Sequence, residues 1–394
     1  MTMPGLARGP LPATAPAVIV GGGITGVALG YELARRGMRN VCVLDAAYPG
    51  AGASGRNGEL VRSAFASREW ATLFDISLRK WLHLSDELDT NVMFTRAGYL
   101  VLASTDEQMA LCRRSVARHA ELGIGTELLD EAGVRRRVPA LAHGYAQGGF
   151  FQRDGGFAHH DAVVWGYVAA AARLGVAIHA GVTATGITVD AGRVTGVTTS
   201  AGPIATPVVV DAAGGRAREV AALAGVEIPT TTQRLEALVT ESMPPFLRPG
   251  VALLAALGYA HQTTRGEFVG GTEIHGVQPP DTMRTSLAGL ADAATKFTAA
   301  FPLLRSVRVI RQWAGIVDVS PDFAPLLGPA PAVEGLWLDC GWVYGFMAGP
   351  GAALLLAEAV TTGRVPAALA PFTVERFARG EPIVEASLVV EAMP

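Results

Sequence analysis

The first 45 residues alternate between apolar runs and a glycine-rich turn in an order that predicts three elements. Residues 17–20 form a short apolar run that is typical of a buried strand. The helix expected after the glycines ends at Gly37, because glycine readily adopts the left-handed conformation that closes many helices. Residues 41–44 predict a second strand, which ends in Asp45. We therefore expect the chain to begin with a strand–helix–strand unit of a parallel sheet.

Later segments predict more strands and several helices. Apolar alternation broken by short turns predicts strands at 177–179, 182–189, 193–199, 208–213, 235–240 and 267–271. Helices are expected at 162–174, 286–300 and 352–360. We expect Pro350 at the start of the last helix, because the N–H that proline lacks would be unpaired there.

The turn after the first strand carries candidate chemistry. Gly21, Gly23 and Gly26 have the GxGxxG spacing, and Asp45 follows Gly26 by 19 residues. In such a turn the glycines let a pyrophosphate approach the backbone and the helix start, while the acid binds ribose hydroxyls. The acid disfavours a 2′-phosphate, so the motif predicts a site for NAD or FAD.

Two further segments favour a flavin. Residues 46–62 are dense in glycine, alanine and serine, which lets backbone approach a flat, bulky group, and 211–215 form a second glycine turn. The helix expected near Pro350 could direct its N-terminus at the isoalloxazine and stabilise the charge gained on reduction.

Composition narrows the class of protein. Only 17% of the residues are charged and the net charge is −3, without a basic run, so we expect no nucleic-acid partner. Three widely spaced cysteines favour neither disulfides nor a metal site and fit a cytoplasmic protein. The apolar stretches 11–31 and 340–357 contain glycine-rich breaks, so we interpret them as buried core rather than as a signal peptide or membrane span.

These segments together resemble the FAD-dependent glycine/D-amino-acid oxidase superfamily, most closely the β subunits of heterotetrameric sarcosine oxidases. The resemblance extends over almost the whole chain after Pro16 and rests on GGGITG with Asp45, RNGELVRS (56–63), SLRKW (77–81), AGYLVLA (97–103), RQWAGIVDVSPD (311–322), CGWVYGF (340–346) and PFTVERFARG (371–380). It implies an α/β fold, with a Rossmann-like FAD-binding domain and an interleaved antiparallel-sheet substrate domain. It also implies FAD-dependent oxidation of a C–N bond in a secondary or tertiary amine or amino acid, with hydride passing to flavin N5 and the imine then hydrolysing.

The resemblance implies which residues hold FAD. They are Gly21, Gly23, Ile24, Thr25, Gly26, Asp45, Ala53, Ser54, Arg56, Asn57, Gly58, Val182, Ala213, Gly214, Trp313, Gly341, Trp342, Gly345, Phe346 and Met347. Single-chain relatives attach FAD through a cysteine where this chain has Gly315, so we expect noncovalent FAD.

The residues implied for the substrate site include one departure from the family. The candidates are Arg62, Tyr259, His261, Trp313, Trp342, Tyr344 and Met347. Relatives that oxidise amino acids commonly have a lysine at the position of Met347, where it helps Arg62 to hold a carboxylate. A larger, more apolar or carboxylate-free amine is therefore expected in place of sarcosine. The segment 268–270 also lacks the lysine with which single-chain oxidases activate oxygen. Whether oxygen or another acceptor takes the electrons therefore stays open.

The length of 394 residues suggests two domains. We expect an FAD-binding domain from 16–90, 145–230 and 330–375, a substrate domain from 91–144 and 231–329, and a C-terminal tail from 376–394. Two other functions stay open: a partner-dependent subunit of a multi-subunit sarcosine- or proline-type oxidase or dehydrogenase, with little activity alone, and an NAD-linked dehydrogenase.

His159, His160 and Asp161 form a cluster whose chemistry is ambiguous. Adjacent histidines cannot easily point at one metal ion, so we expect no metal site. Asp161 fits an N-cap of the helix at 162–174. The resemblance adds an alternative, because the histidine before this aspartate carries covalent FMN in sarcosine oxidase β subunits; His160 would then mark a subunit of a hetero-oligomer.

Overall fold

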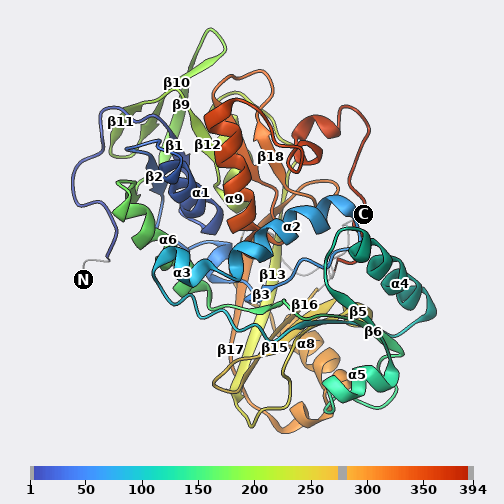
Figure 1. The fold of residues 1–394 in the computed structure, drawn as a ribbon. Coiled ribbons are helices and arrows are strands. Elements are labelled where there is room, and N and C mark those ends of the chain that lie inside the picture. Colours follow the sequence, from blue (N-terminus) through green and yellow to red (C-terminus); the bar gives the residue numbers. More distant parts are fainter. Residues whose placement is uncertain (1–3, 274–281, 389–394) are drawn as a thin grey trace.

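The computed structural model describes residues 4–273 and 282–388, and it contains two main sheets (Figure 1). The first has six strands in the order β18-β19-β12-β1-β2-β8. Their bounds are β1 Val18–Val20, β2 Cys42–Asp45, β8 Ala177–Ala180, β12 Val209–Asp211, β18 Leu326–Pro329 and β19 Leu336–Cys340. All neighbours pair in parallel except β18 and β19. This confirms the Rossmann-like part of the expected fold.

Helices bury the parallel sheet because their small and apolar faces pack on it and on one another. Helix α1 (Ile24–Arg35) contacts both α9 (Gly345–Thr362) and α6 (His160–Arg173), and α9 also contacts α2 (Arg68–Trp81). The remaining α-helices are α3 (Leu84–Leu88), α4 (Asp106–Glu121), α5 (Glu131–Arg137), α7 (Ala217–Ala222) and α8 (Leu287–Ala300). An antiparallel meander of β9 (Ala184–Asp190), β10 (Arg193–Thr199) and β11 (Gly202–Ala205) precedes β12, as the turn spacing predicts.

The second large sheet has eight strands in the order β17-β13-β16-β15-β14-β4-β6-β5. Only the pair β14 and β4 is parallel, which confirms a mainly antiparallel sheet. The bounds are β4 Tyr99–Ala103, β5 Thr126–Asp130, β6 Gly148–Gln152, β13 Thr231–Ser242, β14 Gly250–Leu253, β15 Gly258–Gln262, β16 Glu267–Thr272 and β17 Val309–Val319. A short ladder of β3 (Leu60–Val61) with β7 (Gly156–Phe157) brings residues 59–62 beside 156–160.

Two strands lie inside segments expected for one domain but pair in the sheet of the other. β6 begins at Gly148 but pairs with β4 and β5 in the antiparallel sheet, and β18 ends at Pro329 but pairs with β19 in the parallel sheet. Sequence segments alone could not show this, because strand partners are set by long-range pairing. Of the expected C-terminal tail, residues 389–394 lie outside the described residues.

Two predicted helix starts were wrong. Helix α6 begins at His160, so Asp161 lies inside the first turn and the N-cap residue is His159. Asp161 can still favour the helix by its charge near the N-terminus, which explains why the sequence suggested a cap. Helix α9 begins at Gly345, and Pro350 lies within it.

Helix α2 makes the internal proline of α9 tolerable. Proline disrupts a helix locally and leaves backbone groups that need other partners. The Ser77 hydroxyl donates to the Met347 carbonyl at 2.7 Å and accepts from the Gly351 N–H at 3.1 Å. The Trp81 indole N–H also donates to the Met347 carbonyl, at 2.9 Å. The helix thus continues through Pro350 toward its start at Gly345.

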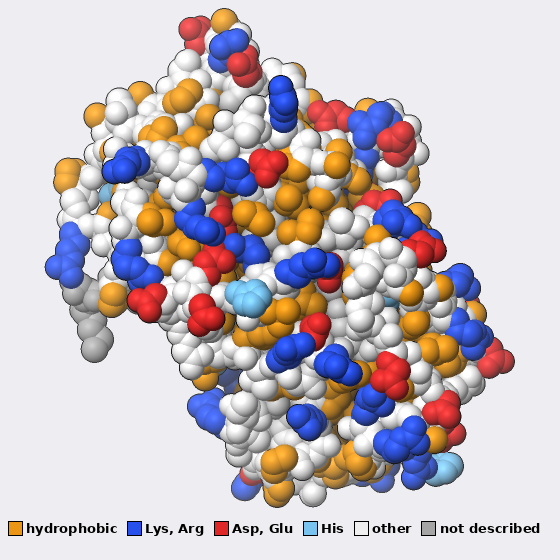
Figure 2. Space-filling view, in the orientation of Figure 1, with side chains coloured by type: hydrophobic (Ala, Val, Ile, Leu, Met, Phe, Trp, Pro, Cys, Tyr) orange, Lys and Arg blue, Asp and Glu red, His pale blue; other side chains and the backbone are white. Residues whose placement is uncertain are grey.

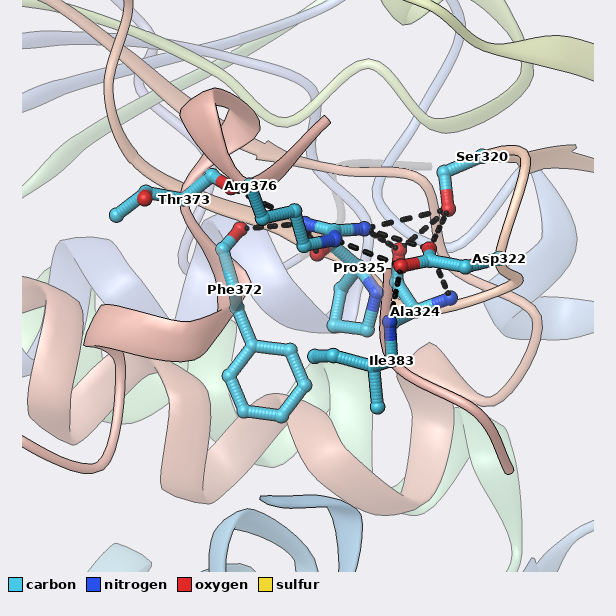
Figure 3. Close-up of polar contacts among 8 residues, drawn as sticks. All are labelled: Ser320, Asp322, Ala324, Pro325, Phe372, Thr373, Arg376 and Ile383. Carbon is cyan, nitrogen blue, oxygen red and sulfur yellow. Dashed lines mark hydrogen bonds and ion pairs between the residues drawn. The ribbon is translucent and has the colours of Figure 1, made fainter. Parts of the chain in front are cut away.

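A buried arginine fastens the C-terminal segment to the loop after β17 (Figure 3). The Arg376 guanidinium forms an ion pair with Asp322 at 2.7 Å and donates to the carbonyls of Ala324, Pro325 and Phe372. Asp322 also accepts from the Ile383 N–H at 2.8 Å. The separate SPD and ERF segments of the sequence therefore form one structural contact.

The face of the molecule in Figure 2 carries no large patch of a single charge, because Asp and Glu side chains lie among the Lys and Arg side chains. Among the described residues, α9 is long and apolar enough to cross a membrane by length and composition, but 61% of it is buried inside the protein. Its contacts with α1 and α2 make it a core helix of this fold.

Candidate functional site

A cavity of about 420 Å³ lies where the two main sheets meet. Residues from the β1–α1 turn, the loop before β3, strands β13, β15 and β17, and the start of α9 line it. Nineteen of the predicted site residues lie on its wall: Gly21, Gly23, Ile24, Thr25, Asp45, Ala53, Ser54, Arg56, Asn57, Gly58, Arg62, Ala213, Gly214, Tyr259, Trp342, Tyr344, Gly345, Phe346 and Met347. One cavity therefore connects the glycine turn to the aromatic and basic candidates.

The dinucleotide end of the cavity is built by close backbone approaches. A Cβ on Gly26 would lie 2.0 Å from the Gly21 carbonyl oxygen, and a Cβ on Gly21 would lie 2.1 Å from that of Ala212. The Asp45 carboxylate accepts from the Gly22 N–H at 2.9 Å. The glycine spacing is thus required by packing in this turn.

The residues present fit a bound FAD. Helix α1 starts at the cavity with Gly23 as N-cap, which has no side chain to cap the first-turn N–H groups. Within the first turn of α1, only the Ile24 N–H has a side-chain partner among the described residues, the Ser54 hydroxyl at 2.9 Å. A pyrophosphate would find free donors and the positive end of the helix dipole here, and Asp45 lies where a ribose would reach.

Three predicted cofactor residues do not line the cavity but hold its wall. Gly26 packs against Gly21, and Gly341 has φ +73° and donates its N–H to the Asp318 carboxylate. The Val182 N–H donates to the Asp45 carbonyl at 2.9 Å, which places Val182 beyond the end of β2. These three residues support the shape of the site from behind its surface.

Trp313 and His261 also lie off the cavity wall. The Trp313 indole N–H donates to the Arg56 carbonyl at 2.9 Å and so fixes the loop before β3. His261 is fully buried and stacks on Phe157, with ring centroids 4.4 Å apart. His261 lies two residues after Tyr259 on β15, and Trp313 lies two residues before Gly315 on β17, so strand alternation alone does not separate them from the wall. The sequence could not show where along each strand the cavity ends.

The substrate end of the cavity contains a buried cation. Arg62 is 2% exposed and donates to the carbonyls of Ala64 at 2.8 Å and Ser387 at 3.4 Å. Its guanidinium also lies over the Phe65 ring, 3.8 Å from the centroid. Since no carboxylate of the described residues pairs with Arg62 within 4.0 Å, its remaining donors can serve an acceptor in the cavity.

Tyr259 and Met347 make the same end apolar and closely packed. A Cβ on Gly58 would lie 2.0 Å from the Tyr259 ring, so only glycine admits that ring. Met347 is 7% exposed and lies in the first turn of α9. Burial raises the pKa of Tyr259, which keeps its hydroxyl protonated.

Sequence reasoning missed four residues with carboxyl groups on the cavity wall, Glu59, Glu219, Asp318 and Asp339. Burial raises the pKa of Asp318 to about 7 and that of Asp339 to about 6. Asp339 accepts from the Trp342 indole N–H at 2.9 Å. Glu59 and Asp318 lie inside segments quoted for the family resemblance, and Asp339 directly precedes another. Those segments are the signal that could have found these three residues, whereas Glu219 lies in none of them.

Glu59 is held between two histidines from different parts of the fold. Its carboxylate lies 2.9 Å from Nδ1 of His160 on α6 and 3.6 Å from Nε2 of His261 on β15. Burial by itself raises the pKa of Glu59, but hydrogen bonds and charge from the two imidazoles hold it well below its usual range. His160 and Asp161 do not line the cavity, and in the described residues no group of three or more His, Cys, Asp or Glu could hold a metal ion.

Comparisons with known proteins agree with this site. The family model for FAD-dependent oxidoreductases of the DAO type matches residues 17–359. The chain is 37% identical over 370 residues to the sarcosine oxidase subunit beta of Rhizobium meliloti, covering 92% of this chain and 88% of that protein. For the corresponding subunit of Rhodobacter capsulatus, the identity is 32% with 93% and 90% covered.

Solved structures share the fold. The L-proline dehydrogenase of P. horikoshii superposes with a TM-score of 0.90 at 26% identity, covering 95% of this chain and all of that chain. The glycine oxidase of Geobacillus kaustophilus gives a TM-score of 0.84 at 23% identity, with 93% and 99% covered. With the glycine turn, the acid after β2 and a cavity that fits FAD, this chain belongs to the DAO family of FAD-dependent oxidoreductases.

Proposed function

We propose that this protein oxidises the C–N bond of a secondary or tertiary amine or amino acid, using noncovalently bound FAD. The observation that carries the proposal is the single cavity that joins the dinucleotide-type turn to Arg62, Tyr259 and Met347. FAD, when bound, supplies the acceptor for a hydride from the carbon beside the nitrogen. The protein residues then have to orient the amine and exclude water.

Arg62, Tyr259, Tyr344 and Met347 are the proposed substrate contacts. Arg62 offers spare guanidinium donors to an acceptor on the substrate, while the other three supply an apolar wall. In this proposal His261 and Trp313 act as supports, because neither lines the cavity. A dry cavity strengthens each polar contact and holds the reacting carbon in place.

The proposed substrate is an amine that is larger or more apolar than sarcosine, or that lacks a carboxylate. Met347 contributes no charge beside Arg62, so a carboxylate would meet one cation where a lysine at this position would supply a second. The relatives named above comprise sarcosine oxidase subunits, an L-proline dehydrogenase and a glycine oxidase, which support C–N chemistry as a class.

An anaerobic substrate screen tests this proposal. FAD-loaded protein is mixed with a panel of secondary and tertiary amines and N-alkyl amino acids, and the flavin absorbance is followed. We expect bleaching by at least one apolar amine, more completely than by sarcosine. A protein that binds no FAD, or FAD that bleaches with dithionite but with no amine, would contradict the proposal.

A partner-dependent form is the second candidate, favoured by the similarity to proteins named as β subunits. His160 would then carry FMN; its side chain is 21% exposed, and Nε2 lies on the side away from Glu59, 3.6 Å from the Asp161 carboxylate. Mass spectrometry of the peptide containing His160, from protein produced with the products of neighbouring genes, tests this. An unmodified peptide and full turnover by the isolated chain would exclude it.

Two organisational features complete the proposal. The FAD-binding domain comprises 16–90, 145–230 and 330–375, with β6 reassigned to the substrate domain and β18 added from it. The protein acts in the cytoplasm, where its three buried cysteines stay as thiols.

A further inference from the structure

A line of titratable side chains runs from the cavity wall to the surface. Glu59 lines the cavity and its side chain is 12% exposed, His160 is 21% exposed, and Asp161 is 63% exposed. The Glu59 carboxylate lies 2.9 Å from Nδ1 of His160, and Nε2 of that ring lies 3.6 Å from the Asp161 carboxylate. The two ring nitrogens therefore face opposite ends of the line.

The backbone holds Glu59 in place at a cost. Its φ is +62°, a left-handed conformation that is unfavourable for a non-glycine residue. The Asn57 side chain accepts from its N–H at 2.6 Å, and its carbonyl accepts from the Ala158 N–H at 2.9 Å. Glycine would adopt this conformation freely, so a role for the carboxylate explains why a glutamate stands there.

Glu59 also interacts electrostatically with side chains on the elements packed around it. His160 on α6 and His261 on β15 favour its ionised form, whereas burial opposes it, and Glu267 on β16 feels its charge. Neither ring nitrogen of His261 makes a hydrogen bond among the described residues, and the 2.9 Å approach of Nδ1 of His160 to Glu59 is an ion-pair contact rather than an aligned hydrogen bond. The ionised form of Glu59 therefore depends on the two imidazoles beside it.

We propose that Glu59 and His160 form a proton path between the substrate cavity and solvent, with Asp161 at its outer end. This rests on the proposed amine oxidation in its single-chain form, in which His160 carries no flavin. An ammonium group must lose a proton before its C–N bond is oxidised, and this proton needs a route from the cavity to solvent.

The transfer balances without a co-reactant. The His160 ring begins the transfer neutral, with its proton on Nε2 and with Nδ1 free to accept. A proton from the ammonium bonds to the Glu59 carboxylate and moves to Nδ1 of His160, while the proton on Nε2 leaves for Asp161 or water. One proton enters and one leaves, and the ring regains its starting tautomer by exchange with water at its exposed side. Glu59 ends ionised and the amine ends neutral.

The variants Glu59→Gln and His160→Gln test the path, with His159→Gln as the matched control. His159 stacks on His160 at 5.1 Å between centroids but is not part of the line. In FAD-loaded protein we expect amine-driven flavin bleaching below pH 8 to slow about 10- to 100-fold in the first two variants and less than twofold in the control. Added imidazole should restore the rate of His160→Gln, which a merely structural defect would not allow.

A second readout separates this proposal from the proposed function. Flash reduction of the FAD-loaded protein by a deazaflavin consumes solvent protons, which an indicator dye can follow without any amine. Slower uptake in Glu59→Gln and His160→Gln supports the path even if no amine bleaches wild type, a result that would overturn only the proposed function. Uptake and bleaching equal to those of wild type in both variants would overturn the path, and so would slowing that imidazole does not relieve.

Discussion

At the scale of single residues, we propose that Met347 separates this chain from relatives that oxidise amino acids. It lies on the cavity wall in the first turn of α9, and Arg62 lines the same cavity. The ionisation of Asp318 and Asp339 is also decided at single residues, because burial raises the pKa of each carboxyl group. Motif spacing in the sequence does not reveal that burial.

Replacing Met347 with lysine should favour substrates that carry a carboxylate. A second cation beside Arg62 adds one charge-assisted hydrogen bond, worth about 1.5–3 kcal/mol. We expect the KM for sarcosine or proline to fall by about tenfold or more, measured by anaerobic flavin reduction at several concentrations. Met347→Leu is the control, and an equal fall in that variant would contradict the explanation.

Replacing Asp339 with asparagine should flatten the dependence of stability on pH. Burial raises the pKa of Asp339 to about 6, so its protonation stabilises the fold fully below about pH 4, and this stabilisation is lost as pH rises through about 6. Asparagine keeps an acceptor for the Trp342 indole N–H but cannot ionise. At pH 8 we expect the variant to be more stable than wild type by roughly 3 kcal/mol.

Urea unfolding of FAD-free protein between pH 4 and 8 measures this effect. Asp318, whose pKa burial raises to about 7, stays in both proteins and keeps part of the decline. Asp190→Asn, at an exposed position, is the control and should follow wild type. Parallel stability curves for Asp339→Asn and wild type would show that Asp339 stays ionised in the fold.

At the scale of elements, α9 depends on α2 for its continuity. Length and composition predict a helix here, but the start at Gly345 requires Ser77 and Trp81 to bond the backbone around Pro350. Gly351 permits that approach, since a Cβ on it would lie 2.6 Å from the Ser77 backbone. The packing of two helices thus decides where one of them begins.

Ser77→Ala should destabilise the protein by about 1–3 kcal/mol, because it leaves the buried Gly351 N–H without its partner. The Met347 carbonyl keeps its bond from Trp81. Denaturant titration of the FAD-free protein measures the loss, and Ser306→Ala, at an exposed position, serves as control. A loss no larger than that of the control would mean that α9 does not need this bond.

At the scale of the whole molecule, distant segments of the chain are tied together at single contacts. Arg376 joins the C-terminal segment to the loop after β17, and Glu59 joins the loop before β3 to both α6 and β15. The cavity itself needs both main sheets. Stability and the site therefore share the same long-range contacts.

Arg376→Met should cost about 3–5 kcal/mol, since it leaves the buried Asp322 carboxylate unpaired. Adding Asp322→Asn should restore part of this loss, because the amide keeps an acceptor without a charge. Unfolding free energies of the two single variants and the double variant form the test. Strictly additive losses would show that the ion pair does not couple the two residues.

The sequence alone predicted the elements whose signals are local. Hydrophobic periodicity and glycine turns located α1 and the strands β1, β2, β8, β9, β10, β12, β13 and β16. The GxGxxG turn with Asp45 predicted the dinucleotide end of the cavity. The resemblance added the family and nineteen residues that line the cavity. These features follow from short-range geometry, which neighbouring residues specify.

Only the tertiary structure decided which faces and partners these elements use. In the structure, His261 and Trp313 lie behind the cavity wall, and α9 begins before its proline. Strands β6 and β18 pair in the sheet of the other domain from the one expected for their segments. The tertiary structure also brought Glu59 between His160 and His261, residues 101 and 202 positions further along the chain. Strand pairing, burial and charge coupling join residues far apart in sequence, so no local pattern contains them.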